Sequence, residues 1–334
     1  MNTSIGDKLT TAQAKLYTGL DFIKFVCAFL IVFMHSFLYD LGATGEWFRH
    51  VITTIGVPFF FITSGFFFKK GLLKNDNSPS YMKRYVWRIV KMYLAWSLIT
   101  LPVSWLCIEW GHSDYSLALK IVYLFRMFLF SGSCGIYWYL LALIISSIII
   151  FYFDVKKKQR WLYLFAILLF IVGVVYDSPF KDSNILFKFI HVVFGSERNF
   201  LNVGLFYMCI GHFFASHTIR CNNVVLFLVL LLSIIVRTLE TQYSSFNCMQ
   251  AVIAAILFLW ASNIDINISD QCSLSFRKLS TVIYLLHFPF LLVYDYNFKR
   301  GTLTGFFFAL AFSIVTYYLL NIILSKKKMT LLFG

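Results

Sequence analysis

Two ionisable side chains lie in the first apolar stretch of the sequence, which predicts a membrane-spanning helix over roughly 20–40. Lys24 and His35 are 11 residues apart, close to three helical turns, so they share a helix face and lie roughly 16 Å apart along its axis. An imidazole titrates near neutral pH and can take a proton from a hydroxyl or carry a covalent group. A snorkelling lysine and a hydrogen-bonded interface histidine are the structural alternatives.

A basic cluster opens the third apolar stretch, where the sequence reads KRYVWRIVKMYLAW. Arg84 and Arg88 are four residues apart, so they lie one turn apart on one face of a helix. Two arginines in this arrangement suit a bidentate grip on phosphate, and Lys83 adds a positive charge beside them. A positively charged anchor at the cytoplasmic membrane surface is the alternative.

Polar side chains also interrupt other apolar stretches. Ser64 precedes a glycine within an aromatic run, and this small pair lets either a ligand or a neighbouring helix approach closely. Tyr139 opens a later stretch, and Tyr284 and His287 are three residues apart in another. An ionisable group inside a span is a functional candidate because its burial is costly, although a satisfied core histidine is the alternative for His287. We expect no special role for His212.

The composition sets the environment in which these residues must act. Of 334 residues, 60% are hydrophobic and 13% are charged, against about 25% charged in soluble domains. This excludes a soluble enzyme and a disordered tail, and it predicts an all-α, polytopic membrane bundle of about ten helices. The segment 117–130 contains Lys120 and Arg126 and is predicted as an interfacial or re-entrant helix. The predicted spans are roughly 20–40, 49–68, 86–107, 136–153, 161–176, 200–216, 223–239, 247–263, 279–296 and 304–324.

Charge distribution predicts the topology. With the N-terminus in the cytoplasm, the inner loops hold roughly twice as many Lys and Arg residues as the outer loops, so both termini are predicted to be cytoplasmic. This arrangement accounts for the net charge of +14 without a nucleic-acid partner. Seven scattered cysteines without a C-x-x-C pair indicate no metal site. We expect a single membrane domain over residues 1–334 with no appended soluble domain.

Several of these segments together resemble the membrane-bound acyltransferase 3 family, whose bacterial members O-acylate surface carbohydrates. DFIKFVCAFLIVFMHS resembles the family's opening span with its basic residue and histidine, and VPFFFITSGFFFKKG resembles its second span. KRYVWRIVKMYLAW, IYWYLLALI and STVIYLLHFP resemble its later segments, and the ten-helix count is also that of the family. Lys24 stands where arginine is the more frequent choice.

The resemblance implies transfer of an acyl group, usually acetyl from acetyl-CoA, to a hydroxyl of a cell-surface polysaccharide or lipid-linked sugar. The protein would lie in the bacterial cytoplasmic (inner) membrane among lipids, with acyl-CoA as donor substrate and no bound cofactor. His35 would be the general base or carry an acyl-histidine intermediate. The other assigned residues are Lys24, which joins His35 in the catalytic pair and helps hold the CoA phosphates; Arg84, Arg88 and Lys83, which bind those phosphates; and Ser64, Tyr139, Tyr284 and His287, which line the acceptor or acyl path.

A transporter or flippase of a lipid-linked oligosaccharide is the alternative function. It would also need about ten helices, aromatic lining and basic inner loops. Transporters of this kind usually show inverted repeats and broken helices at corresponding positions, and the sequence shows no such repeat. Binding or slow hydrolysis of acyl-CoA would distinguish an acyltransferase from a flippase.

Overall fold

The computed structural model describes residues 17–36, 41–176, 200–217, 219, 221–239 and 247–333, and within these ranges every regular element is a helix. The predicted all-α class is therefore confirmed. The α-helices are α1 (Thr18–Ser36), α2 (Gly42–Val51), α3 (Gly56–Lys74), α4 (Pro79–Ile99), α5 (Leu101–Gly111), α6 (Leu117–Arg126), α7 (Trp138–Val155), α8 (Gln159–Tyr176), α10 (Phe206–Ser216), α11 (Asn223–Thr238), α12 (Cys248–Asn263), α13 (Asp270–Asn297), α14 (Leu303–Ile323) and α15 (Lys326–Phe333).

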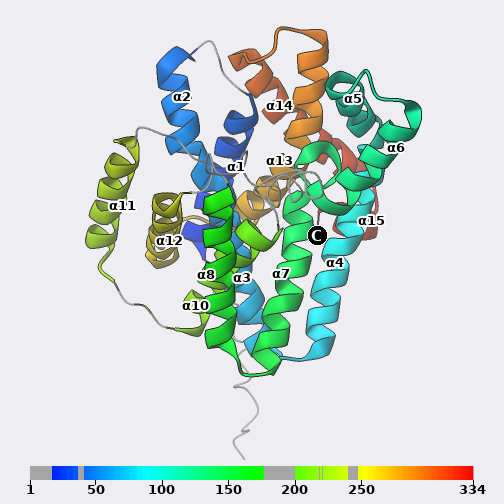
Figure 1. Cartoon of the computed structure of the whole chain (residues 1–334). Helices are drawn as coiled ribbons and strands as arrows, with labels where there is room; N and C mark the ends of the chain where they lie inside the picture. Colours follow the sequence, from blue (N-terminus) through cyan, green and yellow to red (C-terminus); the bar gives the residue numbers. More distant parts are fainter. Residues whose placement is uncertain are drawn as a thin grey trace, which may run out of the picture.

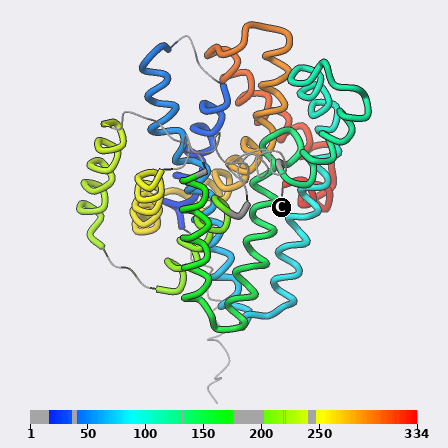
Figure 2. The backbone as a smooth tube through the Cα atoms, viewed as in Figure 1, coloured from blue at the N-terminus to red at the C-terminus, as the bar shows by residue number. Residues whose placement is uncertain are grey.

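The helices form two packed groups that meet at α1 and α3 (Figure 1). In the first group, α13 lies between α1 and α14, and α15 packs across α4. In the second group, α3 packs on α10 and α12, while α4, α7 and α8 run side by side (Figure 2). The helix α11 stands at the edge of the bundle, against α12 and α2. The helices α1, which carries Lys24 and His35, and α3, which carries Ser64, thus form the junction between the two groups.

Five helices among the described residues are long and apolar enough to cross a membrane, or six if α4 and α5 form one bent span. The shorter apolar helices include Gln159–Val175, Asn223–Thr238 and Cys248–Asn263. The described part of each predicted span is mostly helical, and residues 37–40 of the first predicted span lie outside the described residues. About ten membrane crossings are not confirmed. The segment 117–130 folds as α6 followed by a π-helical turn, Met127–Ser131.

The predicted span 86–107 is broken where α4 meets α5, at a bend of 61°. Pro102 lies in the first turn of α5, where its missing N–H is tolerated at the start of a helix but could not continue α4. The hydroxyl of Thr100 donates to the carbonyl oxygen of Trp96 at 2.7 Å. The backbone N–H of Thr100 donates to the same oxygen, with an N···O distance of 2.9 Å. The break is therefore encoded locally by the proline and its neighbours.

Two glycines allow α3 and α10 to cross in backbone contact. A Cβ atom at Gly65 would overlap the backbone carbonyl of Met208, and one at Gly211 would overlap the backbone carbonyl of Ile62. Small residues permit this close approach between membrane helices. The glycine after Ser64 therefore serves helix packing, which is the structural alternative for this motif.

We expect Gly65→Ala to lower the free energy of unfolding by about 1–3 kcal/mol, because the added methyl group must displace a backbone and not a flexible side chain. Gly111→Ala is the matched control, since a Cβ there meets nothing within 4 Å. Thermal unfolding of both purified variants in detergent measures the difference. Equal stability of the two variants would show that the α3–α10 crossing is not constrained as described.

Candidate active site

Two imidazole rings lie together between α1 and α13. His35 is in the last turn of α1, and its ring centre is 5.4 Å from that of His287 on α13 and 5.2 Å from that of Phe288. His287 is fully buried. Its Nδ1 atom is 2.9 Å from the backbone carbonyl oxygens of both Ile283 and Tyr284. Because carbonyl oxygens only accept hydrogen bonds, Nδ1 carries a proton, and in the neutral ring the Nε2 lone pair of His287 is then available.

The Nε2 atom of His287 is itself buried and lacks a hydrogen-bond partner among the described residues. An unpartnered buried polar atom is uncommon and calls for a reason, such as a ligand, a water or a catalytic role. His287 is one of the residues expected to line the acceptor or acyl path. Its neutral ring next to His35 suits a polar group entering between the two helices.

A small cavity, here called the His35 cavity, opens beside these rings. Its volume is about 60 Å³ for the centres of water molecules, against roughly 10–15 Å³ for one water, so it can hold a few waters or a small polar group. His35, Tyr284 and Trp138 bring α1, α13 and α7 to it. The remaining lining residues are Ile31, Met34, Thr54, Val57, Pro58, Ile136, Phe170, Val203, Tyr207 and Gln250.

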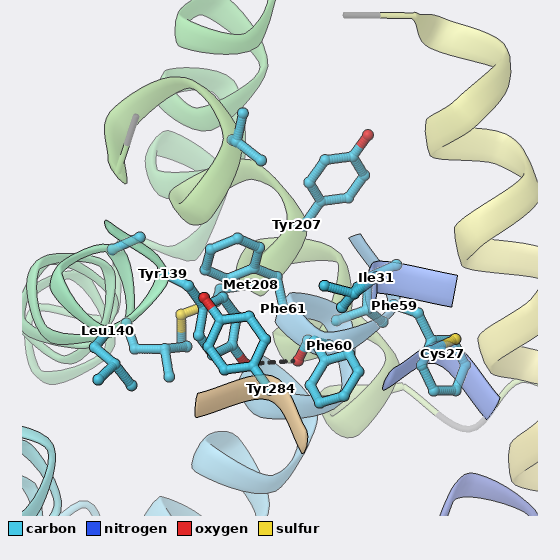
Figure 3. Close-up of a cluster of buried hydrophobic side chains, with 14 of the residues drawn as sticks. Cys27, Ile31, Phe59, Phe60, Phe61, Tyr139, Leu140, Tyr207, Met208 and Tyr284 are labelled. Atoms are coloured by element: carbon cyan, nitrogen blue, oxygen red, sulfur yellow. Dashed lines mark hydrogen bonds between the residues drawn. The ribbon is translucent and has the colours of Figure 1, made fainter. Parts of the chain in front are cut away.

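Aromatic side chains connect Lys24 to this cavity. The helix α1 is unbroken between Lys24 and His35, and the Lys24 Nζ atom lies 5.4 Å from the ring centre of Phe60 on α3, a cation–π distance. The ring of Phe60 contacts those of Tyr139 and Tyr284, as Figure 3 shows. Tyr284 in turn lines the His35 cavity. The structure therefore places both α1 residues on one continuous cluster of side chains.

The four side chains assigned to the acceptor or acyl path also gather in this cluster. The hydroxyl groups of Ser64 and Tyr139 are 2.9 Å apart, and the rings of Tyr139 and Tyr284 are 5.1 Å apart. The Tyr284 hydroxyl donates to the Ile136 carbonyl, and the Tyr284 ring centre is 6.2 Å from that of His287. These hydroxyls are held by protein partners, so they shape the path more than they offer free donors.

A tyrosine that the sequence analysis did not assign fixes α13 at the cavity. Pro289 lies inside α13 and has no N–H to donate to the carbonyl of Leu285. The hydroxyl of the fully buried Tyr137 donates to that carbonyl instead, at 3.0 Å. Gly132 lies five residues before Tyr137 and has a φ of +73°. As a glycine it can adopt this angle, and its backbone lies against that of Tyr137 and Trp138, where a Cβ atom would not fit. Pro289 indicates from the sequence that the carbonyl of Leu285 lacks its helical hydrogen bond. The sequence does not indicate that Tyr137 donates to it.

The residues assigned to the CoA phosphates do not line the His35 cavity. Lys83, Arg84 and Arg88 are exposed on α4. The Arg88 guanidinium lies 5.6 Å from the ring centre of Tyr85. The two arginines do share a helix face, because α4 is regular over this region. These three side chains therefore lie on the outer surface of the bundle, away from the His35 cavity.

The start of α1 is fixed by an ion pair. Asp21 is fully buried and accepts from Arg277 on α13, whose Nε is 2.9 Å from Oδ1 and whose terminal nitrogen is 2.7 Å from Oδ2. Ser273 donates to the same carboxylate at 2.8 Å. A bidentate arginine–carboxylate pair is geometrically restrictive. It sets the position of α1 against α13, and with it the position of Lys24 one turn further on.

His212, for which no special role was expected, belongs to a buried polar network. Its Nε2 atom is 3.0 Å from Asp154 Oδ2, and its Nδ1 atom is 2.8 Å from the Tyr163 hydroxyl. Lys69 donates to the same carboxylate oxygen at 2.7 Å. His212 is fully buried, and Lys69 and Asp154 are 5% exposed. This network joins α3, α7, α8 and α10. The signal for it in the sequence was Asp154, an acidic residue at the end of an apolar stretch.

Comparison with known proteins provides a family match. A family model described as an acyltransferase domain matches residues 17–322. A protein of Enterococcus faecalis named amino-acid racemase is 29% identical over 183 residues, 53% of this chain and 25% of the relative. A second protein of that organism and name is 25% identical over 305 residues, 84% of this chain and 42% of the relative. The chain thus spans less than half the length of these curated relatives. No solved structure matches it.

Proposed function

Because the chain belongs to the acyltransferase 3 family, we propose that it moves an acetyl group from acetyl-CoA to a hydroxyl of a cell-surface polysaccharide or lipid-linked sugar. The observation that carries this proposal is the imidazole of His35, which lines a cavity and contacts the imidazole of His287 behind it, inside a bundle that the family match covers almost completely. The long apolar helices support a membrane location. We assign the protein to the bacterial cytoplasmic membrane, with both termini in the cytoplasm.

In the proposed reaction, His35 takes the proton of the acceptor hydroxyl while that oxygen attacks the thioester carbonyl. The tetrahedral intermediate then collapses, the C–S bond breaks, and the CoA thiolate leaves and takes up the proton from His35. The neutral His287 borders the reacting groups and offers an acceptor nitrogen. If His35 is instead acylated first, the same residue transfers the group in a second step.

Lys24, Arg84, Arg88 and Lys83 are proposed to bind the phosphates of CoA. The three α4 residues are exposed, which suits a soluble anionic donor, and Lys24 is part of the aromatic cluster that leads to His35. The donor would thus lie with its phosphates on the basic face of α4 and its thioester toward the cavity.

The donor site has a direct test. We expect the double variant R84Q/R88Q to bind acetyl-CoA about 100-fold more weakly or worse, because two charge-assisted contacts of about 1.5–3 kcal/mol each are lost. The matched control is K156Q/K158Q, which removes two exposed charges at the turn between α7 and α8. Isothermal titration of both purified variants measures the dissociation constants. If the two double variants weaken binding equally, the α4 face is only an anchor at the membrane surface.

Transport of a lipid-linked oligosaccharide remains the second candidate, and one observation favours it. The broken helix pair α4–α5 resembles the discontinuous helices that transporters use at their binding sites.

The racemase name of the two relatives describes proteins more than twice as long as their matched segments. We therefore do not propose racemase activity for this chain.

Purified protein in detergent distinguishes the two candidates. With acetyl-CoA as the sole substrate, we expect binding and slow release of free CoA thiol, which a thiol-reactive dye detects. A flippase would move a fluorescent lipid-linked sugar across a vesicle bilayer and leave the thioester intact. Folded protein that neither binds nor cleaves acetyl-CoA would contradict the proposed function.

A further inference from the structure

A second pocket lies away from the His35 cavity, where α13, α14 and α15 meet. It has a volume of about 460 Å³. Lys278 reaches it from α13, Tyr317 and Asn321 from α14, and Lys326 and Thr330 from α15. The other lining residues, on α15 and the turn before it, are apolar. We call this feature the α15 pocket.

The polar lining of the α15 pocket suits an anion. Lys278 and Lys326 carry positive charges from different helices, and the Tyr317 and Asn321 side chains add neutral hydrogen-bond donors. No carboxylate is among the lining residues, and neither lysine forms an ion pair within the described part of the chain. Lysine is a common phosphate ligand. The pocket therefore matches a phosphate group.

The walls of the pocket are fixed by packing. The indole N–H of Trp96 on α4 donates to the Leu332 carbonyl of α15 at 2.6 Å, and the Trp96 ring contacts that of Phe333. Leu332 is buried. The short helix α15 is thus held on α4 by its apolar end, while its lysine-rich start borders the pocket. The two lysines consequently face the pocket from separate, mutually fixed helices.

The end of α14 beside the pocket carries exposed apolar side chains that suit lipid tails. Ile322 and Ile323 at the end of α14 are 81% and 75% exposed, and they directly follow Asn321. In a helix long and apolar enough to span a membrane, such residues face the acyl chains of lipids. The lysine run after α14 marks the level of the headgroups. A basic pocket at the headgroup level, beside exposed apolar side chains, suits the headgroup and the tails of a phospholipid.

We propose that the α15 pocket binds the phosphate headgroup of an anionic membrane lipid, with the lipid tails along the exposed end of α14. The inference is independent of acyl transfer, because it uses none of the residues assigned to the donor or the acceptor. A free phosphate, including that of CoA, shares the headgroup chemistry but lacks the tails.

The test compares two double variants that lose the same charge. K278Q/K326Q removes the two pocket lysines, and K327Q/K328Q removes two exposed lysines of α15 that do not line the pocket. Native mass spectrometry of the full chain in detergent gives the apparent dissociation constant for phosphatidylglycerol. We expect K278Q/K326Q to weaken it roughly 10–30-fold and K327Q/K328Q to change it by less than about threefold. K278R/K326R keeps both charges and is expected to retain binding. If K278Q/K326Q does not fold, the binding of K278R/K326R is measured in its place.

Three results would overturn the proposal. Equal weakening by the two glutamine variants would mean diffuse attraction to the basic helix. Equal binding of phosphatidylglycerol and the zwitterionic phosphatidylcholine would mean that the pocket does not select lipids by the net charge of the headgroup. Displacement of the lipid by millimolar inorganic phosphate or CoA would mean that the pocket binds a soluble phosphate and not a lipid.

Discussion

Replacing His35 with alanine is expected to lower the rate of acyl transfer by about 10²–10⁴-fold, the usual effect of losing a general base. Of the described side chains that line the His35 cavity, only the imidazole of His35 titrates near neutral pH, so no other lining residue replaces it as a base. The measurement is transfer of labelled acetyl from acetyl-CoA in isolated membranes, normalised to the amount of protein.

The control for this prediction is His217→Ala. His217 is exposed at the end of α10, where its ring stacks on Phe213, and its loss is expected to leave transfer within about twofold of the wild type. If His35→Ala retains activity within a few fold of the wild type, His35 is not the base. A rate equal to that of membranes lacking the protein, together with labelled protein in the wild type without acceptor, would favour the acyl-histidine route.

Replacing Asp154 with alanine is expected to lower the free energy of unfolding by about 3–5 kcal/mol, since removal of one partner leaves Lys69 buried without its counter-charge. The carboxylate also accepts from His212, so two buried groups lose their partner at once. Thermal unfolding of the detergent-purified protein measures the effect.

Asp114→Ala is the control for Asp154→Ala, because Asp114 is exposed and its loss is expected to change stability by less than about 0.5 kcal/mol. The double variant K69M/D154L removes both charges of the buried pair. It is expected to be more stable than D154A, since apolar replacement of both partners avoids an uncompensated charge. A D154A protein as stable as D114A would show that the network does not hold α3, α7 and α10 together.

The sequence was sufficient to predict the helical class, the family and the shared helix face of Lys24 and His35. Helical periodicity places two residues 11 positions apart on one face wherever the helix is unbroken, and α1 is unbroken over both. Hydropathy was less informative about the number of spans. It does not register a bend such as that at Thr100, nor does it separate helices of about 16 residues from full crossings.

Long-range pairing was beyond what the sequence could predict. Lys69 and Asp154 are 85 residues apart in the chain, and Asp154 and His212 are 58 apart, so no local pattern links them. The same holds for Tyr137 and Leu285, 148 residues apart. Pro289 implies an orphan carbonyl in α13, but only the packed structure identifies the tyrosine hydroxyl that satisfies it.

We propose that this membrane bundle acylates a glycan through the His35 cavity. Mass spectrometry of the surface polysaccharide tests it most directly, in cells with the wild-type protein, with His35→Ala, and without the protein. We predict one additional acetyl group per acceptor sugar in the wild type alone, and the same unmodified mass in the other two. A polysaccharide whose mass is identical in all three, or that keeps its acetyl group with His35→Ala, would contradict the account.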